Sequence, residues 1–443
     1  MRTVDPTPDG SNDAQDDVRV SLPREALKSA LPYIAALLFI IVGGYWLADP
    51  APPKTIVIAV SKHNSDYLAF ARLYGALLQQ DGISLKIQEA SGPVEIMEQL
   101  RQPGGKVDMA FLEGGTASSE STVGIVSLGS LYYQPLWVFS RKGHMVVHLS
   151  SLKGKRIGVG EGGSGTSILA RTILNAAGVT AGNSTLLPMG DDAAEAALQH
   201  GIVDTIFISG LPTSPTVQDL AANPDFVMAD LDEAEAYSRQ FTYLHHLVLP
   251  EGALNLERNI PAHPVNLLVP TVTLVARESM HPALVYLVLK VISRVHGTAG
   301  MLQKAHEFPS DKDSDFELSP QARKFYESGL PFFDRYLPFW AATFLNRVLI
   351  VLVPLIALAI PVTRMAPSVY AWLVKSRIYK LYGELRYLET QLHSRQHPLD
   401  PETCRRELDA IEYRVNHMRL PVAFSSHLYE LRTHIALVRS QIR

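Results

Sequence analysis

The chain has 443 residues, with 40 basic and 44 acidic side chains and a formal net charge of −4. This balance argues against a nucleic-acid-binding surface, which needs an excess of Lys and Arg. The single cysteine, Cys404, lies near the C-terminus. The long middle of the chain therefore forms its core without disulfides, and it has enough residues to do so.

The first long apolar stretch runs from Leu31 to Leu47 (LPYIAALLFIIVGGYWL) and carries no charge. About 17 residues are the lower limit for a helix that crosses a bilayer, so residues 31–48 are predicted to be a transmembrane helix. A cleaved signal peptide is the alternative, but its apolar core is usually shorter. The Asp-rich residues 1–30 before the stretch, predicted to be disordered, also favour an uncleaved anchor.

A second apolar stretch, Val348 to Val362, predicts another transmembrane helix over residues 340–362. A buried core helix interrupted by Pro354 is the alternative, although membrane helices tolerate proline better. Lys and Arg gather before the first stretch and after the second, which marks both termini as cytoplasmic. Residues 54–337 would then lie outside the cytoplasm, in the periplasm of a cell with two membranes, and the chain would cross the inner membrane twice.

Between the two stretches, short apolar runs typical of buried strands alternate with helical patterns. The first expected unit has strands at 55–60, 84–90 and 107–112 and helices at 69–78 and 94–101. After a run at 127–131, a strand is expected at 136–141. The second unit then has strands at 156–159, 185–188 and 203–209 and helices at 167–177 and 192–200. A strand at 265–276 and a helix at 282–295 are expected to return the chain to the first lobe.

This order predicts an α/β fold of two lobes with largely parallel sheets. Lobe 1 is expected over about 54–140 and 270–337, and lobe 2 over about 141–269. Open α/β sheets bind ligands beyond the carboxyl ends of their strands. Five loops are therefore expected to meet at a cleft: 61–67, 113–116, 132–134, 161–167 and 209–211.

Four phrases carry a family resemblance: VDMAFLEGG (107–115), LYYQPLWVFSR (131–141), LKGKRIGVGEGGSGTSILARTILNAAGV (152–179) and VPTVTLVARESMHPALVYLVLKVI (269–292). With them, residues 54 to 300 resemble the TAXI family of TRAP-transporter solute receptors. The resemblance implies a type II periplasmic-binding-protein-like fold that closes on a small, often anionic solute, such as a dicarboxylate or an amino acid. It also implies delivery to a TRAP-type permease. The first loop departs from the family pattern, which leaves the solute class open.

Each of the five loops supplies candidate ligand-binding residues. They are Ser61, His63, Asn64, Tyr67, Glu113, Gly114, Tyr132, Gln134, Gly163, Ser164, Gly165, Thr166, Ser167 and Ser209. Gly163 to Ser167 precede a predicted helix, whose free N–H groups form a natural anion site. A tight turn with an N-cap is the alternative there, a polar surface loop at 61–67, and core packing for the aromatic residues.

Signals for catalysis, metals and cofactors are weak. Gly158 to Gly163 fit G-x-G-x-x-G, but no acidic residue ends the next predicted strand, which argues against a dinucleotide. Ser164 lies in no G-x-S-x-G motif, and His245 and His246 are adjacent and share no helical face. We therefore expect a binding protein that is not an enzyme and uses no cofactor or metal.

Residues 364–443 are predicted to form a cytoplasmic helical hairpin or short coiled coil. Three apolar seams recur at helical spacing: Leu381, Leu385, Leu388 and Leu392; Leu408, Ile411, Val415 and Met418; and Leu428, Leu431, Ile435, Val438 and Ile442. Each seam needs a partner, either inside the tail or on another protein. The leading hypothesis is a membrane-anchored solute receptor for a TRAP-type transporter, and the alternative is a transmembrane sensor that signals through this tail.

Overall fold

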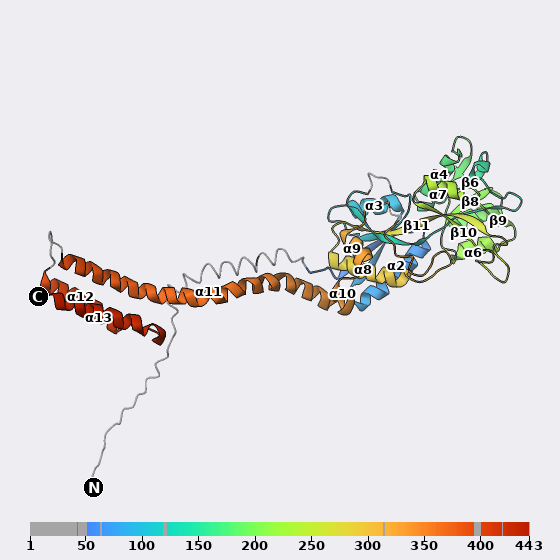
Figure 1. Ribbon diagram of the computed structural model, residues 1–443. Coiled ribbons are helices and arrows are strands. Elements are labelled where there is room, and N and C mark those ends of the chain that lie inside the picture. Colours follow the sequence, from blue (N-terminus) through green and yellow to red (C-terminus); the bar gives the residue numbers. More distant parts are fainter. Residues whose placement is uncertain are drawn as a thin grey trace, which may run out of the picture. The chain divides into compact units, whose positions relative to one another are not determined.

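The structure, a computed structural model, describes residues 42, 51–62, 64–117, 122–312, 315–393, 400–418 and 420–442 (Figure 1). The chain divides into two compact units, one of which is Asp49–Arg347. The other consists of Met1–Ala48 and Val348–Arg443. The predicted disordered segment 1–30 and, except for Val42, the first predicted span 31–48 lie outside the described residues.

The first sheet of the unit Asp49–Arg347 has the strand order β10-β11-β3-β1-β2, with β4 also paired to β11. Its strands are β1 (Thr55–Ser61), β2 (Ser84–Ala90), β3 (Met109–Glu113), β4 (Ile125–Tyr133), β10 (Leu244–Leu249) and β11 (Val265–Arg277). As the alternating pattern predicts, β1 pairs in parallel with both β2 and β3. The helices of this lobe are α2 (Ser65–Gln80), α3 (Pro93–Arg101), α8 (Pro282–His296) and α9 (Pro320–Ser328), followed by α10 (Phe332–Tyr336).

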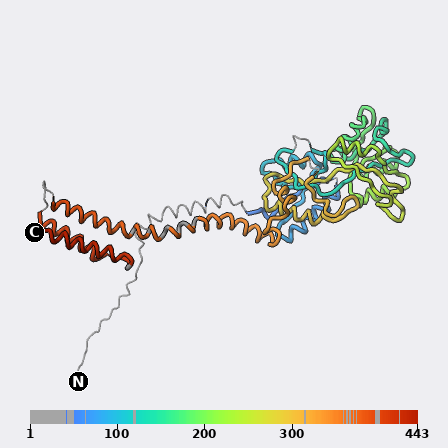
Figure 2. Tube along the Cα trace, viewed as in Figure 1, coloured from blue at the N-terminus to red at the C-terminus, as the bar shows by residue number. Residues whose placement is uncertain are grey.

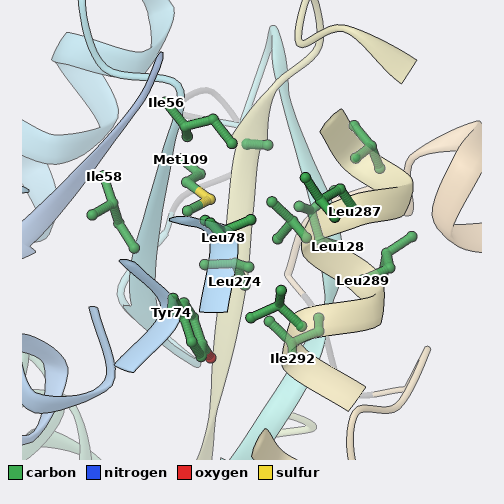
Figure 3. Close-up of a cluster of buried hydrophobic side chains, with 14 of the residues drawn as sticks. Ile56, Ile58, Tyr74, Leu78, Met109, Leu128, Leu274, Leu287, Leu289 and Ile292 are labelled. Atoms are coloured by element: carbon green, nitrogen blue, oxygen red, sulfur yellow. The ribbon is translucent and has the colours of Figure 1, made fainter. Parts of the chain in front are cut away.

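Helices cover both faces of this sheet because successive side chains of a buried strand point to opposite sides. Ile56 and Ile58 of β1 pack against α2 and α8, whereas Ala59 faces the core beneath α3. Figure 3 shows the first of these cores, in which Tyr74 and Leu78 of α2 lie near the sheet. In Figure 1, α2, α8 and α9 lie on one side of the first sheet and α3 lies on the other.

The second sheet has the strand order β7-β6-β8-β5-β9. Its strands are β5 (Leu136–Arg141), β6 (Arg156–Gly158), β7 (Thr185–Leu187), β8 (Thr205–Ser209) and β9 (Phe226–Met228). Its helices are α4 (Gly165–Ala176), α5 (Asp191–Gln199), α6 (Pro215–Ala222) and α7 (Ala234–Gln240). β5 pairs with β8, so the first crossing between the lobes falls before Leu136 and not after residue 140 as expected. Trp137 and Phe139 of β5 belong to the core of the second lobe.

Strand β11 forms the second crossing between the two lobes (Figure 1). Its first half, up to Pro270, pairs with β10, and its second half, from Thr271, pairs with β4 and, over most of its length, with β3. Val269 packs in a core of the second lobe, whereas Leu274 packs in a core of the first. The backbone N–H of Gln134 donates to the carbonyl of Pro270 at 3.0 Å, so the two crossings lie side by side. This pair of crossings has the geometry of a hinge.

Helix α11 (Phe339–Leu392) is continuous over 54 residues and includes Pro354. Within the described residues, one helical segment, Phe339–Ala357, is long and apolar enough to cross a membrane, and 17% of it is buried. It overlaps the predicted span 340–362. The expectation of two spans that flank the binding domain is not supported, because the other predicted span is not among the described residues.

The tail packs on itself as three helices (Figure 2). The last part of α11 lies with α12 (Pro401–Asn416) and α13 (Ser425–Gln441) around one apolar core. All three predicted seams contribute to this core, so each seam finds its partner inside the tail. The predicted hairpin is therefore extended by a third helix. The single cysteine, Cys404, is buried in the same core.

Candidate functional site

A cavity of about 530 Å³ lies between the two lobes. The first lobe lines it with the end of β1 and the loop that follows, including Ser61, Lys62 and Asn64. The second lobe lines it with residues that follow β6 and β7 or begin α6: Glu161, Ser164, Thr166, Asp191, Asp192 and Thr216. Both sheets thus present the carboxyl ends of parallel strands to one cavity, as open α/β sheets do at their binding sites.

A buried polar cluster of four residues, Tyr67, Glu113, Gln134 and Ser209, lies next to this cavity. The Tyr67 hydroxyl donates to Glu113 Oε1 at 3.2 Å, and the Ser209 hydroxyl donates to the same oxygen at 3.1 Å. The amide of Gln134 donates to Glu113 Oε1 and to Ser209 Oγ. We call these residues the Glu113 cluster. Its hydrogen bonds connect the first lobe, the first crossing at Gln134 and the second lobe.

The carboxylate of Glu113 is only 5% exposed, and burial raises its pKa to about 7. The hydrogen bonds from Ser209 and Tyr67 oppose this rise because they stabilise the charged form, and the charge of Asp191 adds to it. The other oxygen, Oε2, has no hydrogen-bond partner among the described residues. A Cβ added to Gly165 would lie 2.6 Å from Oε2, so this oxygen faces the first turn of α4.

The loop before α4 acts both as a helix cap and as a wall of the cavity. Ser164 is the N-cap, and its Oγ accepts a hydrogen bond from the backbone N–H of Ser167 at 3.2 Å. Ser164 and Thr166 line the cavity, whereas Ser167 is buried and its hydroxyl accepts from Arg171 at 3.3 Å. An anion at this helix terminus would meet the carboxylate of Glu113 beside Gly165. The anion site expected at residues 163–167 stays a prediction, and an ionised Glu113 would oppose it.

The first loop contributes in three ways. Asn64 caps α2, because its side-chain oxygen accepts from the backbone N–H groups of Asp66 and Tyr67. Ser61 lines the main cavity, and Tyr67 stacks on Phe111 with ring centroids 5.3 Å apart while it donates to Glu113. His63, also a predicted site residue, lies outside the described residues.

Two predicted site residues lie away from the cavity. Gly114 donates its backbone N–H to Thr271, and a Cβ added there would meet Tyr243 at 3.1 Å. Tyr132 is buried in the core of the first lobe and stacks on His296 with ring centroids 5.4 Å apart. For Tyr132 the alternative of core packing is therefore correct.

Two acidic residues of the second lobe, Asp191 and Asp192, line the cavity and are not among the predicted site residues. They follow β7 and begin α5, whose N-cap is Gly190 without a side-chain hydrogen bond. The rule that located the other loops, polar residues just after a parallel strand, also applies to these two. Burial is the largest cause that raises the pKa of Asp191, to about 6, followed by the charges of Asp192, Asp66 and Glu161.

The two lobes touch around the cavity. Asp66 of the first lobe accepts a hydrogen bond from the backbone N–H of Leu211 of the second at 3.1 Å. Gly92 of the first lobe lies against Gly163 of the second, because a Cβ added to Gly92 would be 2.1 Å from the Gly163 carbonyl oxygen. We call this arrangement, with both contacts formed, the closed state.

Two α/β lobes that share a hinge and close on a polar cavity define a solute-binding protein of the periplasmic-binding-protein type, with a type II fold. Residues 67–327, more than half of the chain, match the NMT1-like family, and the chain belongs to this family. It is a family of periplasmic-binding-protein-like solute receptors related to TAXI. Its members are binding proteins and not enzymes.

Several solved structures are similar to the chain at low identity. One from Bordetella bronchiseptica RB50 shares 19% identity, with 64% of this chain and 91% of that chain covered and a TM-score of 0.39. The periplasmic aliphatic sulphonate binding protein of Escherichia coli shares 16%, with 55% and 73% covered and a TM-score of 0.37. The substrate binding protein of an amino acid ABC transporter shares 17%, with 54% and 92% covered and a TM-score of 0.35. None of these likenesses identifies a solute for this chain.

Proposed function

We propose that this protein is a membrane-anchored receptor that binds a small polar organic solute outside the cytoplasm and delivers it to a TRAP-type permease. The interlobe cavity, lined by polar residues of both lobes, is the observation that carries this proposal. A solute that touches both lobes favours the closed state, because it makes more contacts there than in an open one. A permease that recognises the closed state then receives only loaded receptor.

The resemblance to TAXI receptors implies a dicarboxylate or an amino acid as the solute. The acidic residues Glu161, Asp191 and Asp192 in the cavity favour the amino acid over the dicarboxylate, because two added negative charges would be repelled in a site of low dielectric constant.

Thermal unfolding of the full-length protein in detergent tests solute binding. Amino acids and small organic acids at a concentration of about 100 times the Kd are expected to stabilise it by about 2.7 kcal/mol, a shift of several degrees. Shifts with nucleotides alone, or with no small organic solute, would contradict the proposal.

Reporter fusions test the location of the binding unit. With the anchor formed by Phe339–Ala357 and a second anchor over 31–48, a reporter inserted after Gly105 should be active outside the cytoplasm. A reporter after Arg443 should be active inside. If both reporters share one side of the membrane, the proposed anchoring is wrong.

A transmembrane sensor is the second candidate, and one observation favours it. The single helix α11 contains both the candidate span and the first seam of the tail core, including Leu381 and Leu385. A helix without a break can pass a displacement from one end to the other. Deletion of residues 364–443 separates the candidates: a sensor loses solute-dependent regulation and keeps uptake, whereas a receptor that docks through its tail loses uptake and keeps solute binding.

A further inference from the structure

The charged groups that line the interlobe cavity are mostly of one sign. Among its described residues, the acidic side chains are Glu89, Glu161, Asp191 and Asp192, and Lys62 is the one basic side chain. Lys62 is exposed, and its charge acts on Glu95, which does not line this cavity. Four acidic side chains against one basic side chain leave the described lining with an excess of negative charge.

The negative charges of the second lobe lie close together. A Cβ added to Gly190 would lie 3.4 Å from Glu161 Oε2, which places this carboxylate next to the start of α5, where Asp191 and Asp192 lie. No Lys, Arg or His nitrogen of the described residues lies within 4 Å of the carboxylates of Asp191 or Asp192. Like charges at this spacing disfavour the ionised form of one another.

A second and independent observation comes from the Glu113 cluster. Glu113 and Gln134 are buried, at 5% and 0% exposure, and each keeps one oxygen without a hydrogen-bond partner among the described residues, Oε2 and Oε1 respectively. With Glu113 ionised, both of these orphaned atoms are acceptors. Buried acceptors without donors are unfavourable, so the cluster has the chemistry to receive a group that carries N–H donors.

The space beside Glu113 has the size of such a group. A smaller cavity of about 20 Å³ is lined by Glu113 and Gly165 and shares Ser61, Asn64 and Ser164 with the main cavity. Such a volume accommodates one group of about the size of a water molecule, which is also the size of an ammonium group. The unpartnered carboxylate oxygen therefore faces a small pocket that adjoins the acidic cavity.

We propose that the solute carries an organic cation, an ammonium or a guanidinium group, that lies among these carboxylates and donates hydrogen bonds toward Glu113. This inference rests on the proposed function, because it takes the interlobe cavity as the solute site. A cation that contacts Glu113 of the first lobe and Asp191 of the second stabilises the closed state by bridging the lobes. An organic cation fits better than a metal ion, since no group of three His, Cys, Asp or Glu side chains in the described part of the chain could hold one.

Unfolding temperatures of the full-length protein with five probes at equal ionic strength test the proposal. Lysine, arginine and putrescine carry cationic groups, whereas glutarate and succinate carry two carboxylates and no cationic group; calcium chloride is added as a sixth probe. We expect a shift of several degrees with at least one of the three cationic probes and none with succinate.

The outcomes separate this inference from the proposed function. A shift with glutarate or succinate and none with the cationic probes overturns the cationic solute and leaves the receptor intact. A shift with calcium alone also overturns it. If none of the six probes shifts unfolding while another neutral or anionic organic solute does, the inference again fails and the receptor stands. If no organic solute shifts the unfolding temperature, both the cationic solute and the proposed receptor function are wrong.

Asp191→Asn tests the site of the cation. We expect it to weaken binding of the effective cationic probe at least about tenfold, as for the loss of one partner of a buried charge pair. The matched control is Asp225→Asn, which removes the same charge from an exposed position before β9, in the same lobe and outside the cavity. The control should stay within about twofold of the wild type, and equal affinities of the two variants overturn the assignment.

The ligand-free unfolding temperature shows whether Asp191→Asn folds. It should equal or exceed that of the wild type, because the substitution removes a half-buried carboxylate that its neighbours repel. If this variant does not fold, Glu161→Gln at an exposed position of the cavity gives the same readout. A tenfold loss supports the proposal, and unchanged binding overturns it.

Discussion

Replacing Gly92 by alanine is expected to weaken solute binding about 5- to 150-fold. The added Cβ would lie 2.1 Å from the Gly163 carbonyl oxygen, across the boundary between the lobes. This overlap exists only when the lobes touch, so its energy falls on the closed state. Overpacking of this kind costs about 1–3 kcal/mol, and 1.4 kcal/mol corresponds to a factor of ten in the Kd. Gly92 has a φ of 164°, which is extended backbone, so alanine adds no backbone strain of its own.

Gly162→Ala is the matched control for this experiment. Gly162 lies in the same loop as Gly163, but a Cβ added there meets no atom within 4 Å. Isothermal titration of the full-length protein with a stabilising solute should give nearly the wild-type Kd for the control. The ligand-free unfolding temperature should be close to that of the wild type in both variants. Wild-type affinity in Gly92→Ala would mean that the bound state does not need the contact between Gly92 and Gly163.

Glu113→Gln is expected to change how stability depends on pH. Burial raises the pKa of Glu113 from 4.5 to about 7, so the folded protein favours the protonated carboxyl. The contribution of this group to the free energy of unfolding is complete below pH 4.5 and is lost as the pH rises through about 7. At 1.36 kcal/mol per pKa unit, the loss is on the order of 3 kcal/mol. The glutamine variant does not titrate, so at pH 8 it should be more stable than the wild type by about that amount.

Urea unfolding between pH 4 and pH 8, followed by tryptophan fluorescence, measures this effect, since Trp137 is fully buried in the second lobe. The variant should keep the smaller slope that comes from Asp191, whose pKa is raised to about 6. Glu98→Gln, at an exposed position of α3, is the control and should follow the wild-type profile. Parallel profiles for Glu113→Gln and the wild type would show that Glu113 does not titrate in this range.

Hydrophobic periodicity predicted most of the binding unit because it reports which residues are buried. The runs at 55–60 and 107–112 became β1 and β3, and the loops after them meet at the cavity. Periodicity does not report which sheet a strand joins, so β5 was assigned to the wrong lobe. Tyr132 was misjudged for a related reason: a polar aromatic residue beside a cleft and one in the core give the same local pattern.

Local sequence patterns could not predict the negative charge of the cavity. Glu89, Glu161 and Asp191 come from segments that lie far apart in the sequence, and only the fold brings them together. The glycine-rich loop before α4 has the composition of an anion site, but Glu113 of the other lobe faces it. An ionised Glu113 would therefore oppose an anion at this loop, which the sequence of the loop alone does not reveal.

The position of Gln134 has a mechanical consequence. Its backbone belongs to the crossing, through the hydrogen bond to Pro270, and its side chain holds Glu113 and Ser209. Gln134 is thus part of the hinge through its backbone and part of the contact between the lobes through its side chain. A solute that displaces Glu113 from its hydrogen bonds also changes the bonds of Gln134 at the hinge. Occupation of the pocket and the angle between the lobes are therefore coupled.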